Sequence, residues 1–331
     1  MGGKRRNIVL MVLPHEFGPM FEDFSVGGQI SPLPSVTLTE GDNTWFRAVT
    51  GDQHLQTADR MIHQQVSGSS GALANPGLVM HFSIGQTTNA TRRAIANLYY
   101  RSVRILRPVH IGETLFTTTT VLGLRESAPK GDQHRGKVWL GITTSSEHGP
   151  VVEYERCALI PARAGGTGHA DDIPGPSDPT PLSELTGAVP DWNLSTLPFS
   201  DWLINEERTD PLRDHIDLAA PFARSTFNQA AVHRDHTLGA GGRRLVYGGH
   251  VQALAQASLT RILPGLAHIV SWDGCDHIGP AYEGDLLEFS HRLVEELPVG
   301  TGRLLRLEVN GSTVEGGSGH ILRWTPVVWA P

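Results

Sequence analysis

The chain has 331 residues, of which 39% are hydrophobic and 18% are charged, and its formal net charge is −7. This composition is typical of a globular protein, and the negative charge argues against nucleic acid or an acidic membrane as a partner. Cys157 and Cys275 have no metal-ligand spacing, and no apolar run approaches the roughly 20 residues that cross a bilayer, so we expect a cytoplasmic protein without a metal site.

The first half begins with a helical stretch at Thr44–Asp59, followed by a glycine-containing turn and a longer apolar helix at Asn75–Thr88. After Gly112 the residues alternate in polarity, which is typical of a β-strand. Further strand-like sequence continues to Pro161. The expected order is therefore a helical stretch, a buried helix and several antiparallel strands.

Residues 164–195 are rich in Gly, Pro and Asp and have no sustained periodicity, which is typical of a linker. At roughly 100–200 residues per domain, the length predicts two domains or one duplicated domain. We therefore expect domains at 1–163 and 196–331.

The second half repeats the first. One offset aligns five positions of Thr44–Asp59 with Ala219–Asp235: Phe46 with Phe222, Thr50 with Thr226, Asp52 with Asn228, Thr57 with His233, and Asp59 with Asp235. A second offset aligns Pro108 with Pro280 and Gly112 with Gly284. The repeat predicts an α+β fold in which each half wraps a bent antiparallel sheet around one central helix.

Several strings resemble the MaoC-like acyl-CoA hydratases, in this order: FEDFSVGG (21–28), TEGDNTWFRAVTGD (39–52), NPGL (75–78), RPVHIGETL (107–115), RRLVYGGH (243–250) and GCDHIGPAYEGD (274–285). Three others resemble the mesaconyl-CoA hydratases, or β-methylmalyl-CoA dehydratases, of that family: IGQTTNATRRAIANLYYRS (84–102), GTGHADD (166–172) and WDGCDHIGP (272–280).

The resemblance implies two tandem hotdog folds and reversible addition of water to an enoyl-CoA, with mesaconyl-CoA as the expected substrate. CoA would belong to the substrate, so no cofactor is expected. Whether the chain is a monomer or a homo-oligomer stays open.

His233 stands where the family motif has its catalytic histidine, and a base with a near-neutral pKa suits the activation of water. Asn228 replaces the motif aspartate and can orient a ligand but cannot accept a proton. A carboxylate could then come from Asp52 or Asp276. The first-half counterpart of His233 is Thr57, which predicts that the first half has lost its site.

Gly248 and Gly249 precede the second central helix, and their N–H groups are the expected oxyanion donors. The remaining candidates are substrate-binding residues: Arg243 and Arg244 for a carboxylate or CoA phosphates, His250 beside the same turn, and Asp276 with His277 as a site pair or a strand-end ion pair.

Two alternatives stay open on the same fold. A thioesterase would direct water at the thioester carbonyl and would favour a carboxylate at position 228. A non-catalytic acyl-CoA-binding protein is the second, since fold does not fix chemistry.

Overall fold

The structure is a computed structural model that describes residues 10–11, 18–176, 178–314 and 319–331. The first half contains helices α1 (Glu40–Thr50), α2 (Leu55–Ala58), α3 (Arg60–Ser67) and α4 (Pro76–Thr87) and strands β1 (Leu10–Met11), β2 (Gln29–Ile30), β3 (Val36–Thr37), β4 (Ala96–Ile105), β5 (Thr114–Lys130), β6 (Gln133–Ser146) and β7 (Gly149–Pro161).

The second half repeats this order after α5 (Leu182–Leu185). It contains α6 (Ala219–Ser225) and α7 (Gly248–Ile262), with strands β8 (Glu207–Thr209), β9 (Asp214–His215), β10 (His268–His277), β11 (Leu286–Val299), β12 (Gly302–Thr313) and β13 (His320–Ala330). Short 3-10 turns occur at Phe21–Asp23, Thr186–Ala188, Leu194–Thr196, Ala231–His233, His236–Leu238 and Ala240–Gly242.

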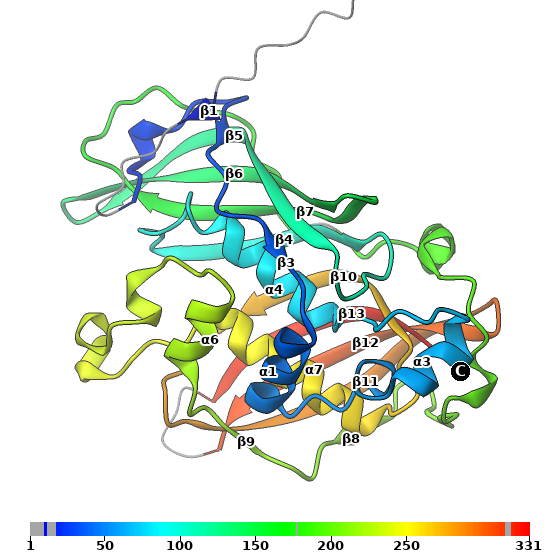
Figure 1. The fold of residues 1–331 in the computed structure, drawn as a ribbon. Coiled ribbons are helices and arrows are strands. Elements are labelled where there is room, and N and C mark those ends of the chain that lie inside the picture. The colour runs from blue at the N-terminus through cyan, green and yellow to red at the C-terminus, as the bar shows by residue number, and fades with distance from the viewer. Residues whose placement is uncertain (1–9, 12–17, 177, 315–318) are drawn as a thin grey trace, which may run out of the picture.

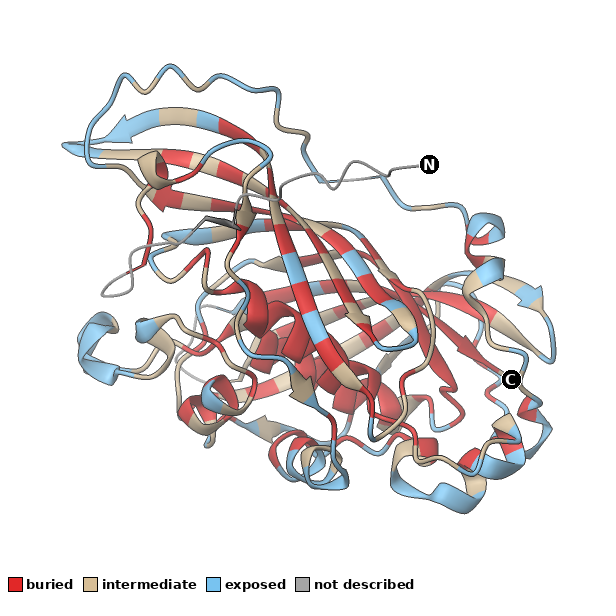
Figure 2. Ribbon diagram, turned by 45° about the horizontal axis from the view of Figure 1, so that its top comes forward, coloured by how far each residue is buried: buried red, intermediate tan, exposed pale blue. Residues whose placement is uncertain are grey.

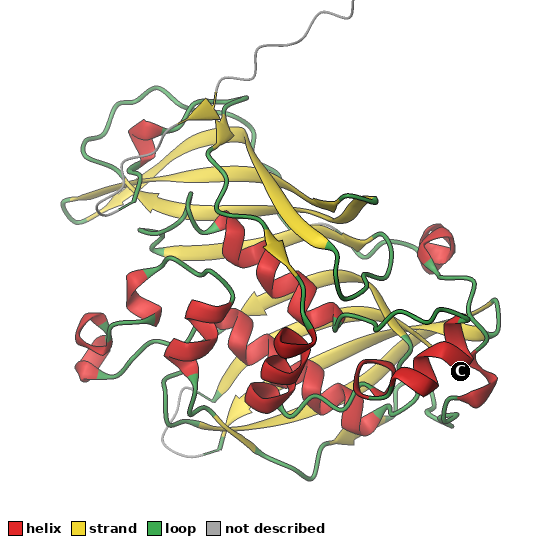
Figure 3. Cartoon of the chain, viewed as in Figure 1, coloured by secondary structure: helices red, strands yellow, loops and turns green. Residues whose placement is uncertain are grey.

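The strands form one sheet in the described part of the chain, with the main order β1-β2-β5-β6-β7-β4-β10-β13-β12-β11-β8. The two halves join where β4 pairs antiparallel with β10, through Arg104 with Ser271 and Val103 with Trp272. Helices α4 and α7 lie side by side on the inner side of the curved sheet (Figure 1 and Figure 3). The predicted α+β fold, with two helix-and-sheet units in tandem, is confirmed.

Both central helices are buried along nearly their whole length (Figure 2). Helix α4 begins with a conventional cap: the side chain of Asn75 accepts a hydrogen bond from the N–H of Gly77, and Pro76 occupies the first turn. No side chain caps the start of α7, where Tyr247 is the N-cap residue. The N-terminus of α7 therefore keeps backbone donors that α4 has committed to Asn75.

Gly85 allows α4 to approach the second half closely. A Cβ at this position would lie 1.5 Å from the carbonyl oxygen of Thr226, so any other residue would push the helix away. Thr226 is the C-cap of α6 and is followed two residues later by Asn228. This contact places the segment after α6 beside the C-terminal end of α4.

The predicted strands after Gly112 and Gly284 are β5 and β11, and the later strand-like segments form β6, β7, β12 and β13. The 164–195 segment contains α5 and short turns. No helix within the described ranges is long and apolar enough to cross a membrane.

Candidate active site

A cavity of about 480 Å³ lies at the N-terminal end of α7, between the two halves. The second half contributes Asn228, Val232, His233, Tyr247, Gly248, His277 and Pro280 to its wall, and the first half contributes Ile84, Thr88, Thr91, Asn97, Tyr100 and Arg156. This volume is within the range of small-molecule sites. The linear repeat therefore produces one composite cavity that needs both halves.

His233 ends the 3-10 turn Ala231–His233 and lines the cavity. Its Nδ1 lies 3.0 Å from the carbonyl oxygen of Leu245. A carbonyl only accepts hydrogen bonds, so Nδ1 carries the proton and Nε2 has the free lone pair. Burial lowers the pKa of His233 below its usual value, against the weaker opposing effect of the Leu245 carbonyl. The imidazole is therefore neutral at pH 7 and can accept a proton at Nε2.

His277 ends β10 and packs directly on the first residue of α7. A Cβ on Gly248 would lie only 2.5 Å from Nε2 of His277, so glycine is needed at this close approach. Burial lowers the pKa of His277 to about 4; Asp276 opposes this shift and His233 adds to it. Two neutral imidazoles thus share the cavity wall.

Asn228 is 2% exposed and lines the cavity. Its side-chain oxygen accepts a hydrogen bond of 2.9 Å from the N–H of Ala230, which leaves the amide NH₂ as the group that can donate to a ligand. The residues that line the cavity include no Asp or Glu. A carboxylate from Asp52 or Asp276 therefore does not replace the missing aspartate at the cavity wall.

Gly248 lines the cavity, whereas Gly249 is buried behind it against the ring of Tyr247. Tyr247 itself lines the cavity, with its ring centroid 5.7 Å from that of His233. The Tyr247 hydroxyl is buried and has no hydrogen-bond partner among the described residues. Donors of two kinds, backbone N–H and phenol, thus occur at the start of α7.

Four of the expected substrate-binding residues lie outside the cavity wall. Arg243 forms an ion pair with Asp285, and Arg244 forms one with Glu283, so both guanidinium groups are already paired. His250 stacks on Phe222, with ring centroids 4.6 Å apart.

The fourth is Asp276, which accepts a hydrogen bond of 2.9 Å from Arg323. Neighbouring strand residues point to opposite faces of a sheet, which separates Asp276 from His277. His277 lines the cavity and Asp276 does not, and Asp276 forms its strand-end ion pair with Arg323.

Sequence reasoning missed the contribution of the first half. Arg156 and Tyr100 are paired across β4 and β7, and both line the cavity. Arg156 follows Tyr154 at strand spacing, and both side chains are buried. The sequence does carry one signal for this residue: an arginine stands on the apolar face of a strand, where a charged side chain is unusual.

No family model matches the chain. A solved structure of a conserved hypothetical protein from Mycobacterium tuberculosis, described as having a double hotdog fold, is 33% identical, covers 94% of this chain and 98% of its own, and superimposes with a TM-score of 0.84. The chain belongs to the double-hotdog family of this protein. A putative MaoC domain dehydratase from Chloroflexus aurantiacus, 24% identical and covering 95% and 97% of the two chains, has the same fold with a TM-score of 0.84.

Two curated relatives are named for an activity. The mesaconyl-CoA hydratase of Cereibacter sphaeroides is 28% identical over 81% of this chain and 81% of its own length. The β-methylmalyl-CoA dehydratase of Chloroflexus aurantiacus is 29% identical over 82% and 80%.

A small counterpart of the cavity lies beside α4, mostly within the first hotdog. It measures about 10 Å³ and is lined by Leu73, Ala74, Pro76, Val79, Ile105, Arg107, Pro108, Val109 and His268. Each of these residues aligns in the repeat with a residue that lines the large cavity; for example, Ile105 aligns with His277 and Pro76 with Gly248. A volume of this size admits about one water molecule.

In the first hotdog, side chains fill the space that corresponds to the rest of the large cavity. Gln256, which aligns with the cavity residue Ile84, lies over Gly77 and donates hydrogen bonds to Asp52 (3.0 Å) and Asn75 (2.9 Å). Asp52 is thereby fixed in a buried polar network at the start of α4.

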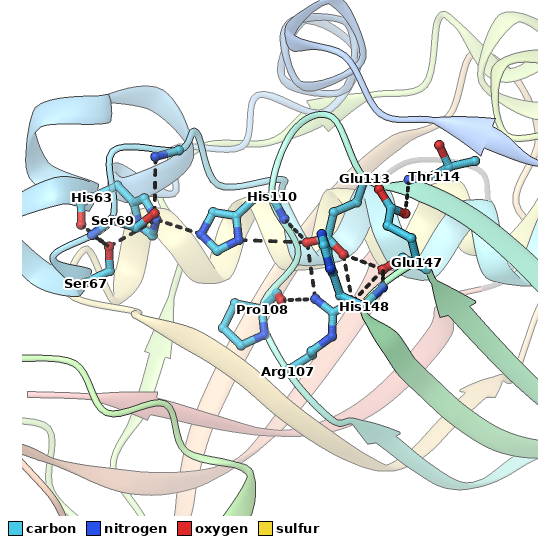
Figure 4. Close-up of polar contacts among 12 residues, drawn as sticks. His63, Ser67, Ser69, Arg107, Pro108, His110, Glu113, Thr114, Glu147 and His148 are labelled. Carbon is cyan, nitrogen blue, oxygen red and sulfur yellow. Dashed lines mark hydrogen bonds and ion pairs between the residues drawn. The ribbon is translucent and has the colours of Figure 1, made fainter.

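The loop after β4 is fixed as well, since Glu113 accepts hydrogen bonds from the backbone of His110 and the side chain of Arg107 (Figure 4). The two hotdogs therefore differ sharply in the space they offer to a ligand.

Proposed function

We propose that the protein is a hydro-lyase that adds water reversibly to the double bond of an enoyl-CoA thioester. The observation that carries this proposal is His233, a neutral histidine with a free Nε2, in a cavity beside the uncapped N-terminus of α7. The names of the two curated relatives support it.

The reaction needs a base for water and donors for the thioester oxygen. Nε2 of His233 accepts a proton from water as the water oxygen bonds to C3, and the amide NH₂ of Asn228 orients that water. Negative charge then develops on the thioester oxygen, where the N–H group of Gly248 at the helix N-terminus stabilises it. The proton held by His233 is transferred to C2, which completes the addition of one water molecule.

For the substrate, we propose mesaconyl-CoA, which hydration converts to β-methylmalyl-CoA. Both curated relatives are named for this pair of compounds. In addition, the two sequence strings 84–102 and 272–280, which resemble mesaconyl-CoA hydratases, supply cavity residues that include Ile84, Tyr100 and His277. CoA enters as part of the substrate, so the proposed reaction uses no cofactor.

The experiment follows the loss of enoyl-thioester absorbance with mesaconyl-CoA. Wild-type protein should hydrate it, and His233→Ala should lower kcat by about 10²–10⁴-fold because the general base is removed. His236→Ala is the matched control, since His236 lies three residues later and is exposed. Activity of His233→Ala within a few-fold of wild type would remove His233 from the mechanism.

The same assay separates the alternatives. Release of free CoA without hydrated thioester would identify a thioesterase. Tight binding of acyl-CoA without either product would identify a binding protein.

A further inference from the structure

Arg156 is an unusual residue for the wall of an otherwise uncharged cavity. It is 4% exposed and comes from β7 of the first hotdog, whereas His233, Gly248 and His277 come from the second. Its side chain donates hydrogen bonds to the hydroxyls of Thr87 (2.8 Å) and Thr91 (3.3 Å). Nε has no hydrogen-bond partner in the described part of the chain.

Two other arginines with buried side chains are neutralised by carboxylates. Arg306 pairs with Asp273 at 2.6 Å, and Arg261 pairs with Asp210 at 2.6 Å. Arg156 has no carboxylate within ion-pair distance among the described residues. A buried guanidinium without a counter-ion costs several kcal/mol, so its partner is expected to come from outside the chain.

The fold itself does not require a charge at this position. Strand register pairs Arg156 with Tyr100 between β7 and β4, and the corresponding pair between β13 and β10 is Pro326 with Trp272. Both strand pairs also have a register shift at the same place, which lies just before Tyr99 in β4 and just before Ser271 in β10. The second hotdog thus builds the same piece of sheet from uncharged residues.

Tyr100 and Tyr247 line the same cavity as Arg156 and place two phenols near the guanidinium. The Arg156 carbon Cζ lies 5.8 Å from the centroid of the Tyr100 ring. The positive charge of Arg156 also acts on the Tyr247 hydroxyl, whose pKa is nevertheless raised by burial. The ring of Tyr247 in turn lies beside that of His233. A ligand that reaches Arg156 therefore also comes close to the base.

We propose that Arg156 binds a second, free carboxylate on the acyl group and makes the cavity selective for acidic enoyl-CoA substrates. This inference rests on the proposed hydration of an enoyl-CoA. A planar guanidinium matches a carboxylate in geometry and in charge, and the pair forms in a water-poor cavity. In mesaconyl-CoA the free carboxylate is attached to C3, the carbon that receives the hydroxyl. Thr87 and Thr91 act as positioning residues that hold the guanidinium toward the ligand.

The test compares mesaconyl-CoA with tiglyl-CoA, in which a methyl group replaces the free carboxylate and the geometry at the double bond is the same. Wild-type protein should prefer mesaconyl-CoA in kcat/KM by about 10²-fold or more. Arg156→Gln should lower kcat/KM about 10²-fold for mesaconyl-CoA and change it less than about threefold for tiglyl-CoA. For mesaconyl-CoA, the kcat/KM of Arg156→Lys should lie between those of the wild type and Arg156→Gln. Retained activity on tiglyl-CoA also shows that the variant is folded.

Arg101→Gln is the matched control. Arg101 lies next to Tyr100 on β4, where it pairs with Glu155 at 3.3 Å and does not line the cavity. Arg101→Gln should leave kcat/KM unchanged for both mesaconyl-CoA and tiglyl-CoA. An equal loss of both activities in Arg156→Gln, or a wild-type protein without preference for the acidic substrate, would overturn the role of Arg156.

A binding measurement separates this inference from the hydratase proposal. Calorimetric titration with the saturated analogues methylsuccinyl-CoA and 2-methylbutyryl-CoA requires no turnover. Wild-type protein should bind the acidic analogue at least about tenfold more tightly, and Arg156→Gln should lose the difference. If the wild type shows this binding preference but does not hydrate mesaconyl-CoA, only the proposed reaction is contradicted. Equal binding of both analogues by the wild type would contradict the carboxylate subsite.

Discussion

Gly248→Ala is the substitution for which the structure gives the most definite expectation. The added Cβ would lie 2.5 Å from Nε2 and 2.6 Å from Cε1 of His277, whereas carbon contacts in proteins are about 3.5–4.0 Å. The imidazole, which lines the cavity, must therefore move by about 1 Å from its place against α7. Overpacking of this kind costs about 1–3 kcal/mol of unfolding free energy.

The same substitution should affect catalysis. Gly248 supplies a proposed oxyanion donor and His277 shares the cavity wall, so a displacement of about 1 Å should lower kcat/KM by about 10²-fold. The assays are hydration of mesaconyl-CoA and denaturant unfolding. Gly274→Ala is the control, because Gly274 lies on the same strand as His277 and a Cβ there would meet nothing within 4 Å.

A double variant identifies the contact itself. In Gly248→Ala/His277→Ala the clash is absent, so its loss of stability should be smaller than the sum of the two single losses. Wild-type stability and activity in Gly248→Ala would refute the close packing of His277 on α7. Additive losses in the double variant would refute the clash as the cause.

Two further predictions concern ligand stoichiometry and pH. Calorimetric titration with methylsuccinyl-CoA should give one site per chain, because the counterpart in the first hotdog measures about 10 Å³; two equivalent sites would contradict the asymmetry. Burial lowers the pKa of His81, His250 and His268 to about 3, so the unfolded state binds more protons than the folded state between about pH 6.5 and 3. Stability should therefore fall as pH falls below about 6.5, by about 2 kcal/mol for each of these imidazoles at pH 5. Urea midpoints measured between pH 7 and 5 test this, and a midpoint that does not change would show that these histidines are protonated in the folded protein.

Sequence patterns predicted the elements whose periodicity is regular. The alternation after Gly112 and Gly284 identified β5 and β11, and the apolar run after Gly248 identified α7. Strands β4 and β10 were not predicted. Most of β10 is buried on both faces and both strands contain register shifts, so neither gives a clean alternation.

The site was predictable only within one half. His233, Asn228 and Gly248 lie close together in the sequence of the second hotdog and also in the cavity. Arg156 reaches the same cavity only because β4 joins β10 and α4 packs against the segment after α6. Such contacts between halves have no local sequence signal, so the sequence pointed only to Arg243 and Arg244, which pair with carboxylates outside the cavity.

The most direct test of the account is the fate of oxygen from solvent. Wild-type protein should be incubated with mesaconyl-CoA in water that carries the heavy oxygen isotope, and the products should be analysed by mass spectrometry. The proposed mechanism predicts an intact CoA thioester that has gained one labelled hydroxyl at C3. Free CoA together with label in a newly released carboxylate would contradict it, as would recovery of mesaconyl-CoA alone with no hydrated thioester.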